Sequence, residues 1–189
     1  GYCRVNAAHT RAYTEEMPEG YEPTMASSPK NVVVVGGGPA GMEAAAVAAK
    51  RGHKVTLYEE KDALGGTLGF AAAIKGPHER ILDFRDYQIK QLEQAGVDVK
   101  TGVKVDASTI KDAAPDVVVL ATGILKSDSS IPVSGDKAVL NLEEAAAAKV
   151  EGPVCIVGDN LRATDYANFL VEQGISVNLV HEGTKEELA

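Results

Sequence analysis

Three consecutive glycines, followed by a proline and a further glycine, form the segment with the clearest chemistry. Gly36, Gly38 and Gly41 stand at G-x-G-x-x-G spacing, and Pro39 and Ala40 lie between the last two. The first glycine permits a tight turn, the second lets a pyrophosphate approach the backbone, and the third lets a helix pack close to a sheet. Because the first turn of a helix also presents unpaired N–H groups, this loop predicts a phosphate-binding site.

Carboxylates follow the glycine loop at the spacing that a dinucleotide site uses. Glu59 and Glu60 come after Tyr58, at the end of an apolar run about 20 residues beyond the loop. A carboxylate at this place accepts hydrogen bonds from the ribose hydroxyls of an adenosine and repels a 2′-phosphate. Loop and acids together predict a dinucleotide site, and the glycine loop alone does not separate NAD from FAD.

The elements that must position these groups alternate between strand and helix. We expect a strand over residues 32–35, whose continuous valines suit burial on both faces, a helix over 39–50 and a strand over 54–60. Pro39 fits the first position of the helix and Gly52 its end. This succession predicts a β-α-β unit with parallel strands.

Further elements follow along the first half of the chain. The Gly- and Ala-rich stretch 62–77 predicts a loop, and residues 77–95 predict a helix. One strand or a short pair is expected within 97–105, and a buried strand within 116–123 that runs into a Thr-Gly turn. One stripe of the helix is apolar, with Ile81, Phe84, Leu92 and Ala95.

A second β-α-β unit is expected near the end of the chain. After a loop over 124–136 and a helix over 142–149, strand, helix and strand patterns succeed one another over 153–180. Its own loop keeps only the first glycine, Gly158, and continues with Asp159 and Asn160. We expect both side chains to weaken pyrophosphate binding by an NAD(P)H site here. Glu182 is a candidate ribose-binding acid or a plain surface residue.

Composition and charge exclude several classes of protein. The net charge is −8, which speaks against nucleic-acid or anionic-membrane partners. No apolar run is long enough to span a bilayer, and no secretion signal is visible. The two cysteines, Cys3 and Cys155, form no C-x-x-C pair, and the histidines lack metal-ligand spacing. We therefore expect a cytoplasmic protein. The first residue is not Met, so we expect a part of a longer chain.

The motifs together resemble a known class of flavoprotein. "VVVVGGGPAGMEAA", "GHKVTLYE", "LGG" and "VVVLATG" are similar to the flavoproteins with two dinucleotide-binding domains. The resemblance implies FAD, or a bare ADP moiety, at the first site. It adds these residues to the site: Gly65, Gly66, Thr67, Val105, Ala121, Thr122 and Gly123. Disulfide reductases of this class carry a redox cysteine pair, which is missing after Gly66, and we expect Cys155 to pack as a small hydrophobe.

The first residues sharpen the resemblance. "CRVNAAHTR" is similar to the segment with the last cluster cysteine in iron–sulfur flavoenzymes related to Old Yellow Enzyme, which include 2,4-dienoyl-CoA reductase and trimethylamine dehydrogenase. In the family pattern C-x-V-N-P, Ala7 replaces the proline. The resemblance implies an upstream FMN-binding barrel, as domain or subunit, and a [4Fe–4S] cluster. Cys3 would be an orphan ligand of that cluster, because one thiolate cannot hold a cluster that needs four.

These observations predict an α/β fold with a Rossmann-like parallel sheet flanked by helices, and a second, partial nucleotide-type module. We expect an arm over 1–29, an FAD- or ADP-binding domain over 30–125, a connection over 126–152 and the partial module over 153–189. A rival interpretation takes "CIVGDN" as the segment that closes the FAD site, but a helix, glycine and strand pattern follows it.

The resemblance implies an NAD(P)H-dependent flavin oxidoreductase that passes electrons through FAD to the cluster and FMN. We find no candidate catalytic acid, base or nucleophile, so the chain alone is not expected to be catalytically complete. The alternative hypothesis is a non-catalytic module that binds adenine nucleotide or serves for docking.

Overall fold

The computed structural model describes residues 23–76, 80–123, 134–136, 138–158 and 160–181. Cys3, Asp159 and Glu182 lie outside these residues. The chain divides into two compact units. Among the described residues, one contains 23–68 and 82–123, and the other contains 69–76, 80–81 and those from 134 onward.

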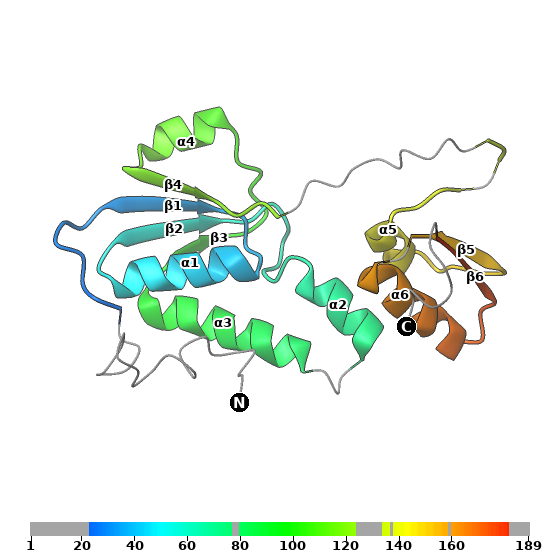
Figure 1. The fold of residues 1–189 in the computed structure, drawn as a ribbon. Helices are drawn as coiled ribbons and strands as arrows, with labels where there is room; N and C mark the ends of the chain where they lie inside the picture. Colours follow the sequence, from blue (N-terminus) through cyan, green and yellow to red (C-terminus); the bar gives the residue numbers. More distant parts are fainter. Residues whose placement is uncertain (1–22, 77–79, 124–133, 137, 159, 182–189) are drawn as a thin grey trace. The chain divides into compact units, whose positions relative to one another are not determined.

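The first unit is built on a parallel four-stranded sheet (Figure 1). Its strands are β1 (Asn31–Val35), β2 (Lys54–Tyr58), β3 (Asp98–Lys100) and β4 (Val117–Leu120). Their order is β3-β2-β1-β4, so the chain adds strands on one side of β1 and then crosses to the other. The point where the order reverses, between β1 and β4, is where open α/β sheets bind their ligands. The predicted Rossmann-like sheet is confirmed.

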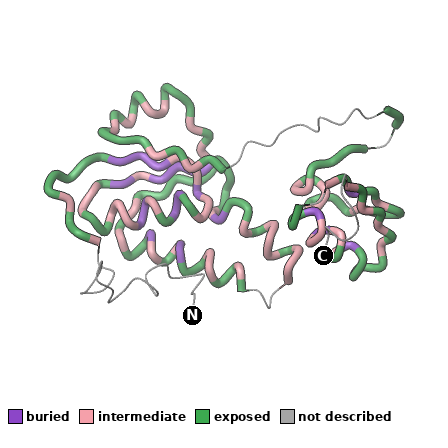
Figure 2. The backbone as a smooth tube through the Cα atoms, in the orientation of Figure 1, coloured by how far each residue is buried: buried purple, intermediate pink, exposed green. Residues whose placement is uncertain are grey.

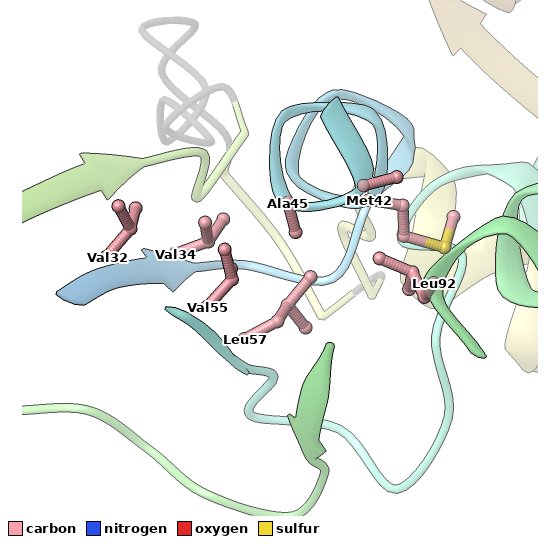
Figure 3. Packing of buried hydrophobic residues seen from close by; sticks show 8 residues of the cluster. Val32, Val34, Met42, Ala45, Val55, Leu57 and Leu92 are labelled. Carbon is pink, nitrogen blue, oxygen red and sulfur yellow. The ribbon is translucent and has the colours of Figure 1, made fainter. Parts of the chain in front are cut away.

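Helices α1 (Pro39–Lys50) and α3 (Ile81–Ala95) pack with the sheet to form the core of this unit. Figure 3 shows side chains of β1 and β2 directed toward Ala45 and Met42 of α1 and Leu92 of α3. Figure 2 shows the buried backbone concentrated in β1, β2 and α1. The core cluster consists of Val32, Val34, Met42, Ala45, Ala46, Val55, Leu57 and Leu92. Alanines on α1 allow the helix axis to approach the strands closely.

The apolar stripe expected on α3 contains a polar residue. Leu92 is fully buried as predicted, but the other buried side chain of this helix is Gln88. Ile81, Phe84 and Ala95 are only half-buried. Gln88 lies one turn before Leu92, so it occupies a stripe position that the search for apolar residues passes over.

Helices α2 (Leu68–Lys75) and α4 (Ala107–Ala113) were not expected. The loop predicted over 62–77 is therefore wrong in its second half, because three consecutive alanines favour helix more strongly than one glycine opposes it. Helix α4 begins with a capping box, in which Asp106 accepts from the Thr109 N–H. Hydrogen bonds from Ser108 and Thr109 lower the pKa of the Asp106 carboxyl to about 2.

The second unit contains a parallel strand pair with a helix between the strands. Helix α5 (Leu142–Ala147) precedes β5 (Val154–Val157), α6 (Leu161–Glu172) and β6 (Val177–Val180), and β5 pairs with β6 in parallel. The predicted second β-α-β module is confirmed. Its core consists of Ile156, Ala163, Tyr166 and Leu170.

Two details of the second unit differ from the sequence-based expectation. Helix α2 from Gly69 onward groups with this unit, since Ile74 packs against its core and Lys75 pairs with Asp165 at 3.0 Å. Cys155, expected to pack as a small hydrophobe, is exposed, because its side chain lies on the opposite face of β5 from buried Ile156.

Leu92 should be essential to the stability of the first unit. Leu92→Ala removes a fully buried side chain between α3 and α1, and we expect the free energy of unfolding to fall by about 2 to 5 kcal/mol. The control is Leu82→Ala, an exposed leucine on the same helix, which should change it by less than about 0.5 kcal/mol. Urea denaturation followed by circular dichroism measures both. An equal loss of unfolding free energy in both variants would contradict the placement of Leu92 in the core.

Candidate dinucleotide-binding site

The predicted site residues follow the carboxyl ends of adjacent strands. Gly36 follows β1, Glu59 follows β2, and Ala121 follows β4. The strand hydrogen bonding continues into these positions, since the Gly36 N–H donates to the Tyr58 carbonyl at 2.8 Å and the Ala121 N–H donates to the Val35 carbonyl at 2.8 Å. Residues far apart in sequence therefore meet at one edge of the sheet.

The glycine loop packs backbone against backbone at two positions. A Cβ atom on Gly41 would collide with the carbonyl oxygen of Gly36, and one on Gly36 would collide with the carbonyl oxygen of Ala121. Gly36 also has a φ of +107°, a conformation that L side chains rarely adopt. These two positions require glycine for the fold itself, before any ligand is considered.

Gly38 is different because the space beside it is open. A Cβ atom built on Gly38 would have its nearest neighbour, the Gly66 Cα, at 3.9 Å. Its φ of −75° and ψ of 179° suit any residue. The fold does not require glycine at this position. A ligand that approaches the backbone closely would require it.

Glu59 connects the end of β2 to the glycine loop. Its Oε2 accepts from the Gly37 N–H at 2.6 Å and its Oε1 accepts from the Lys61 N–H at 2.9 Å. The side chain is buried, with 9% of the residue exposed. Hydrogen bonds to a carboxylate are about twice as strong as neutral ones, so Glu59 fixes the loop and leaves further lone pairs for a ligand.

Two further residues lie in this part of the structure. They are Glu60, the second predicted acid, and Gly37, the glycine between the first two of the motif. Glu60 points to solvent and lies 3.7 Å from the Lys104 Nζ, so it does not share the position of Glu59. Gly37 was not among the predicted site residues. A Cβ on Gly37 would press against Leu64 and Glu59. The run of three glycines, one more than the motif needs, was the signal that could have revealed it.

The glycine pair after β2 packs against the first loop. The Gly65 N–H donates to the Gly37 carbonyl at 2.9 Å, and a Cβ on Gly66 would lie 3.0 Å from the Gly38 Cα. Gly65 and Gly66 both have positive φ, +123° and +54°. The two glycine segments therefore form one continuous backbone surface around Gly38.

The remaining predicted residues surround this surface less closely. Thr67, Thr122 and Gly123 are exposed, and they follow the second glycine segment or the end of β4. Val105 is half-buried in the segment between β3 and α4. Tyr58 is buried at the end of β2, and the Lys100 Nζ lies 5.4 Å from its ring centroid.

The N-terminus of α1 is open, whereas that of α6 is closed by its own side chain. Helix α1 has Gly38 as N-cap, no side-chain cap and no acidic residue in its first turn. Its first N–H groups point outward at the positive end of the helix dipole. In α6 the Asn160 Oδ1 accepts from the Ala163 N–H at 3.0 Å. The two β-α-β units share their topology, but only the helix of the second unit has a side-chain cap at its N-terminus.

Gln88 of α3 is hydrogen-bonded to the first turn of α1. Its Nε2 donates to the Pro39 carbonyl at 3.1 Å, and the residue is 3% exposed. Its Oε1 is buried without a hydrogen-bond partner in the described part of the chain. The glycine cradle and the uncapped helix end fit a dinucleotide.

Metal and membrane sites are not found where the structure can be searched. Within the described ranges no three His, Cys, Asp or Glu side chains gather as metal ligands. Among the same residues, every helix is too short or too polar to cross a membrane. The predicted cluster ligand Cys3 lies outside them.

Comparison with known proteins places this geometry in a family. Residues 30–186 match the family model described as pyridine nucleotide-disulphide oxidoreductase. The chain belongs to this family. An NADH oxidase of Thermoanaerobacter brockii is 44% identical over 160 residues, which are 80% of this chain and 24% of the relative. A multifunctional alkene reductase/demethylase OYE of Caballeronia cordobensis is 32% identical over 180 residues, 93% of this chain and 26% of the relative.

A solved structure has a similar fold. A 2-naphthoyl-CoA reductase complex matches with a TM-score of 0.75 and 34% identity, over 86% of this chain and 25% of that one. The predicted resemblance to flavoenzymes related to Old Yellow Enzyme is confirmed. The chain spans about a quarter of the length of these relatives. A dinucleotide-binding fold is thus shown both by the family and by the geometry.

Gly38 and Gly41 should respond differently to replacement by alanine, which adds one methyl group. Gly38→Ala should weaken ADP binding at least tenfold, because the methyl occupies the open approach to the backbone, while costing no more than about 1 kcal/mol at the N-cap. Gly41→Ala should lose both binding and stability, since its Cβ meets the Gly36 carbonyl. Calorimetric titration with ADP and thermal unfolding measure the pair. Unchanged ADP affinity in Gly38→Ala would remove the loop from the site.

Proposed function

We propose that the first unit binds the ADP part of FAD in an NAD(P)H-dependent flavin oxidoreductase. In this proposal electrons pass from NAD(P)H through FAD toward an iron–sulfur cluster and FMN in an upstream domain or subunit. The observation that carries the proposal is the open backbone surface at Gly38, set between two packed glycine segments and an uncapped helix. Such a surface admits a pyrophosphate that a side chain would exclude.

The residues divide the work of binding between two parts of the dinucleotide. The first-turn N–H groups of α1 face the pyrophosphate, and Gly38 and Gly66 let it approach. Glu59 accepts from the ribose hydroxyls with the lone pairs not used by Gly37 and Lys61. Its negative charge disfavours a 2′-phosphate at that place.

FAD is favoured over NAD by the segments that pack on the glycine loop. Gly65 and Gly66 lie against Gly37 and Gly38, and Ala121 lies against Gly36. These are the segments that the flavoprotein resemblance assigns to the FAD site. When bound, the flavin supplies the hydride and electron transfer, and the protein binds and orients it. We assign no catalytic acid, base or nucleophile to this chain.

A larger protein is supported by the lengths of the relatives. The matched parts are only 24% and 26% of the two enzymes, so three quarters of each relative lies outside the match. We propose that an FMN-binding barrel and the cluster cysteines lie upstream of the dinucleotide domain, with Cys3 as one cluster ligand.

A second candidate function is favoured by the closed end of α6. The Asn160 Oδ1 already occupies the Ala163 N–H, and a pyrophosphate would have to displace it. In this alternative the second unit does not hold NAD(P)H. The chain is then a module that binds adenine nucleotide at the first site and serves for docking.

FAD binding is the direct test of the first candidate. The purified chain mixed with FAD and desalted should retain a flavin band at about 450 nm. ADP should displace the flavin, and 2′-phosphorylated ADP should compete at least tenfold less well because of Glu59. A chain that binds ADP but not FAD supports the second candidate. A chain that binds neither contradicts the assigned site.

The second unit is tested separately by disabling the first. Gly38→Asp places bulk and negative charge at the pyrophosphate approach, so NADH bound by this variant reports on the loop before α6. The second candidate predicts no NADH binding by the variant, measured as nucleotide fluorescence during titration, because Asn160 closes that helix end. The wild-type chain is the control for the contribution of the first site. Tight NADH binding by Gly38→Asp would show that the second loop is open.

A further inference from the structure

Helix α3 carries a cationic side chain onto the glycine segments. A Cβ atom on Gly65 would lie 2.9 Å from the Cδ and 3.2 Å from the Cγ of Arg85. The aliphatic stem of Arg85 therefore rests on the Gly65 backbone, and 32% of the side chain is exposed. Since the Gly65 N–H is bonded to the Gly37 carbonyl, this stem lies against the same backbone surface that borders Gly38.

Gln88 shows that this face of α3 is directed at the start of α1. Residues three apart on a helix share a face, so Arg85 and Gln88 are neighbours. Gln88 donates to the Pro39 carbonyl at 3.1 Å, inside the first turn of α1. Gln88 thus contacts the start of α1, and Arg85 contacts the second glycine segment. Gly38 lies between the two contacted segments.

The charge balance of the site calls for a cation. A pyrophosphate brings negative charge next to the buried carboxylate of Glu59. The glycine loop itself, residues 36–41, contains no lysine or arginine. The partial charge of the α1 dipole is then opposed by Glu59. Arginine suits the missing role because its planar fork of donors matches two phosphate oxygens.

The present partner of Arg85 holds it only weakly. Nε and Nη2 donate to the same oxygen, Asp86 Oδ1, at 2.9 and 2.7 Å. Asp86 is the next residue in the chain, and 62% of its side chain is exposed. Exposed ion pairs of this kind contribute little to stability, so the guanidinium can exchange this carboxylate for a phosphate at small cost.

We propose that Arg85 binds the pyrophosphate of the dinucleotide, with its stem held on Gly65 and its guanidinium turned from Asp86 to the phosphate oxygens. This inference rests on the proposed function of the first site and names a binding residue outside the glycine motif. Asp86 then acts as the resting partner of the guanidinium in the absence of the nucleotide.

The test compares ADP with adenosine, which lacks phosphate. Each competes with FAD for the wild-type chain and for Arg85→Met, which keeps a stem on Gly65 but removes the charge. We expect the variant to bind ADP about tenfold or more weakly, since a hydrogen-bonded charge contact is lost, and to bind adenosine unchanged. Lys90→Ala, which removes an exposed positive charge from the same helix, should change neither.

Asp86→Asn supplies the opposite change. It releases the guanidinium from its resting carboxylate, so ADP should bind equally well or more tightly. Equal ADP affinity in wild type and Arg85→Met overturns the proposal. An equal loss for ADP and adenosine also overturns it, because it indicates a structural role. A wild-type chain that binds neither FAD nor ADP overturns the proposed function, and this inference with it.

Discussion

The carbonyl oxygen of Gly36 occupies the place that a side chain at position 41 would need, and the carbonyl of Ala121 does the same for position 36. These contacts set how closely α1 approaches β1 and the end of β4. The alanines of α1 extend the close approach along the helix, where Ala45 and Ala46 pack on the valines of β1 and β2. The open site at Gly38 exists because its neighbours are packed without side chains.

Glu59 adds an electrostatic constraint to this steric one. A buried carboxylate is costly unless its oxygens are hydrogen-bonded, and the Gly37 and Lys61 N–H groups meet that need. In the proposed function the same negative charge would select among ligands, since a carboxylate there would accept from ribose hydroxyls and repel a 2′-phosphate. In this proposal one side chain, Glu59, would set both the loop geometry and the nucleotide preference, and the proposed role of Arg85 is to offset its charge where a pyrophosphate would bind.

The two β-α-β units share a topology but differ at the start of their helices. Both have a parallel strand pair and a helix that starts after a glycine-containing turn. Helix α1 has no side-chain cap at its first turn, whereas Asn160 satisfies the Ala163 N–H of α6. An anion gains binding energy from unpaired donors and gains little where a local cap competes for them. The family model matches residues 30–186, which include parts of both units, and the caps distinguish the two helix ends.

The sequence by itself determined the parallel sheet, the glycine loop and the position of Glu59, because strand, turn and helix preferences along residues 32–59 all agree locally. It did not reveal α2, where local glycine and alanine signals conflict, or α4, a helix of only seven residues. Only the tertiary structure decided that Gly37 bonds to Glu59, that Gln88 is buried under Pro39, and that Arg85 rests on Gly65. These contacts join residues 20 to 49 positions apart, and the packing of separate elements, which no local pattern encodes, brings them together.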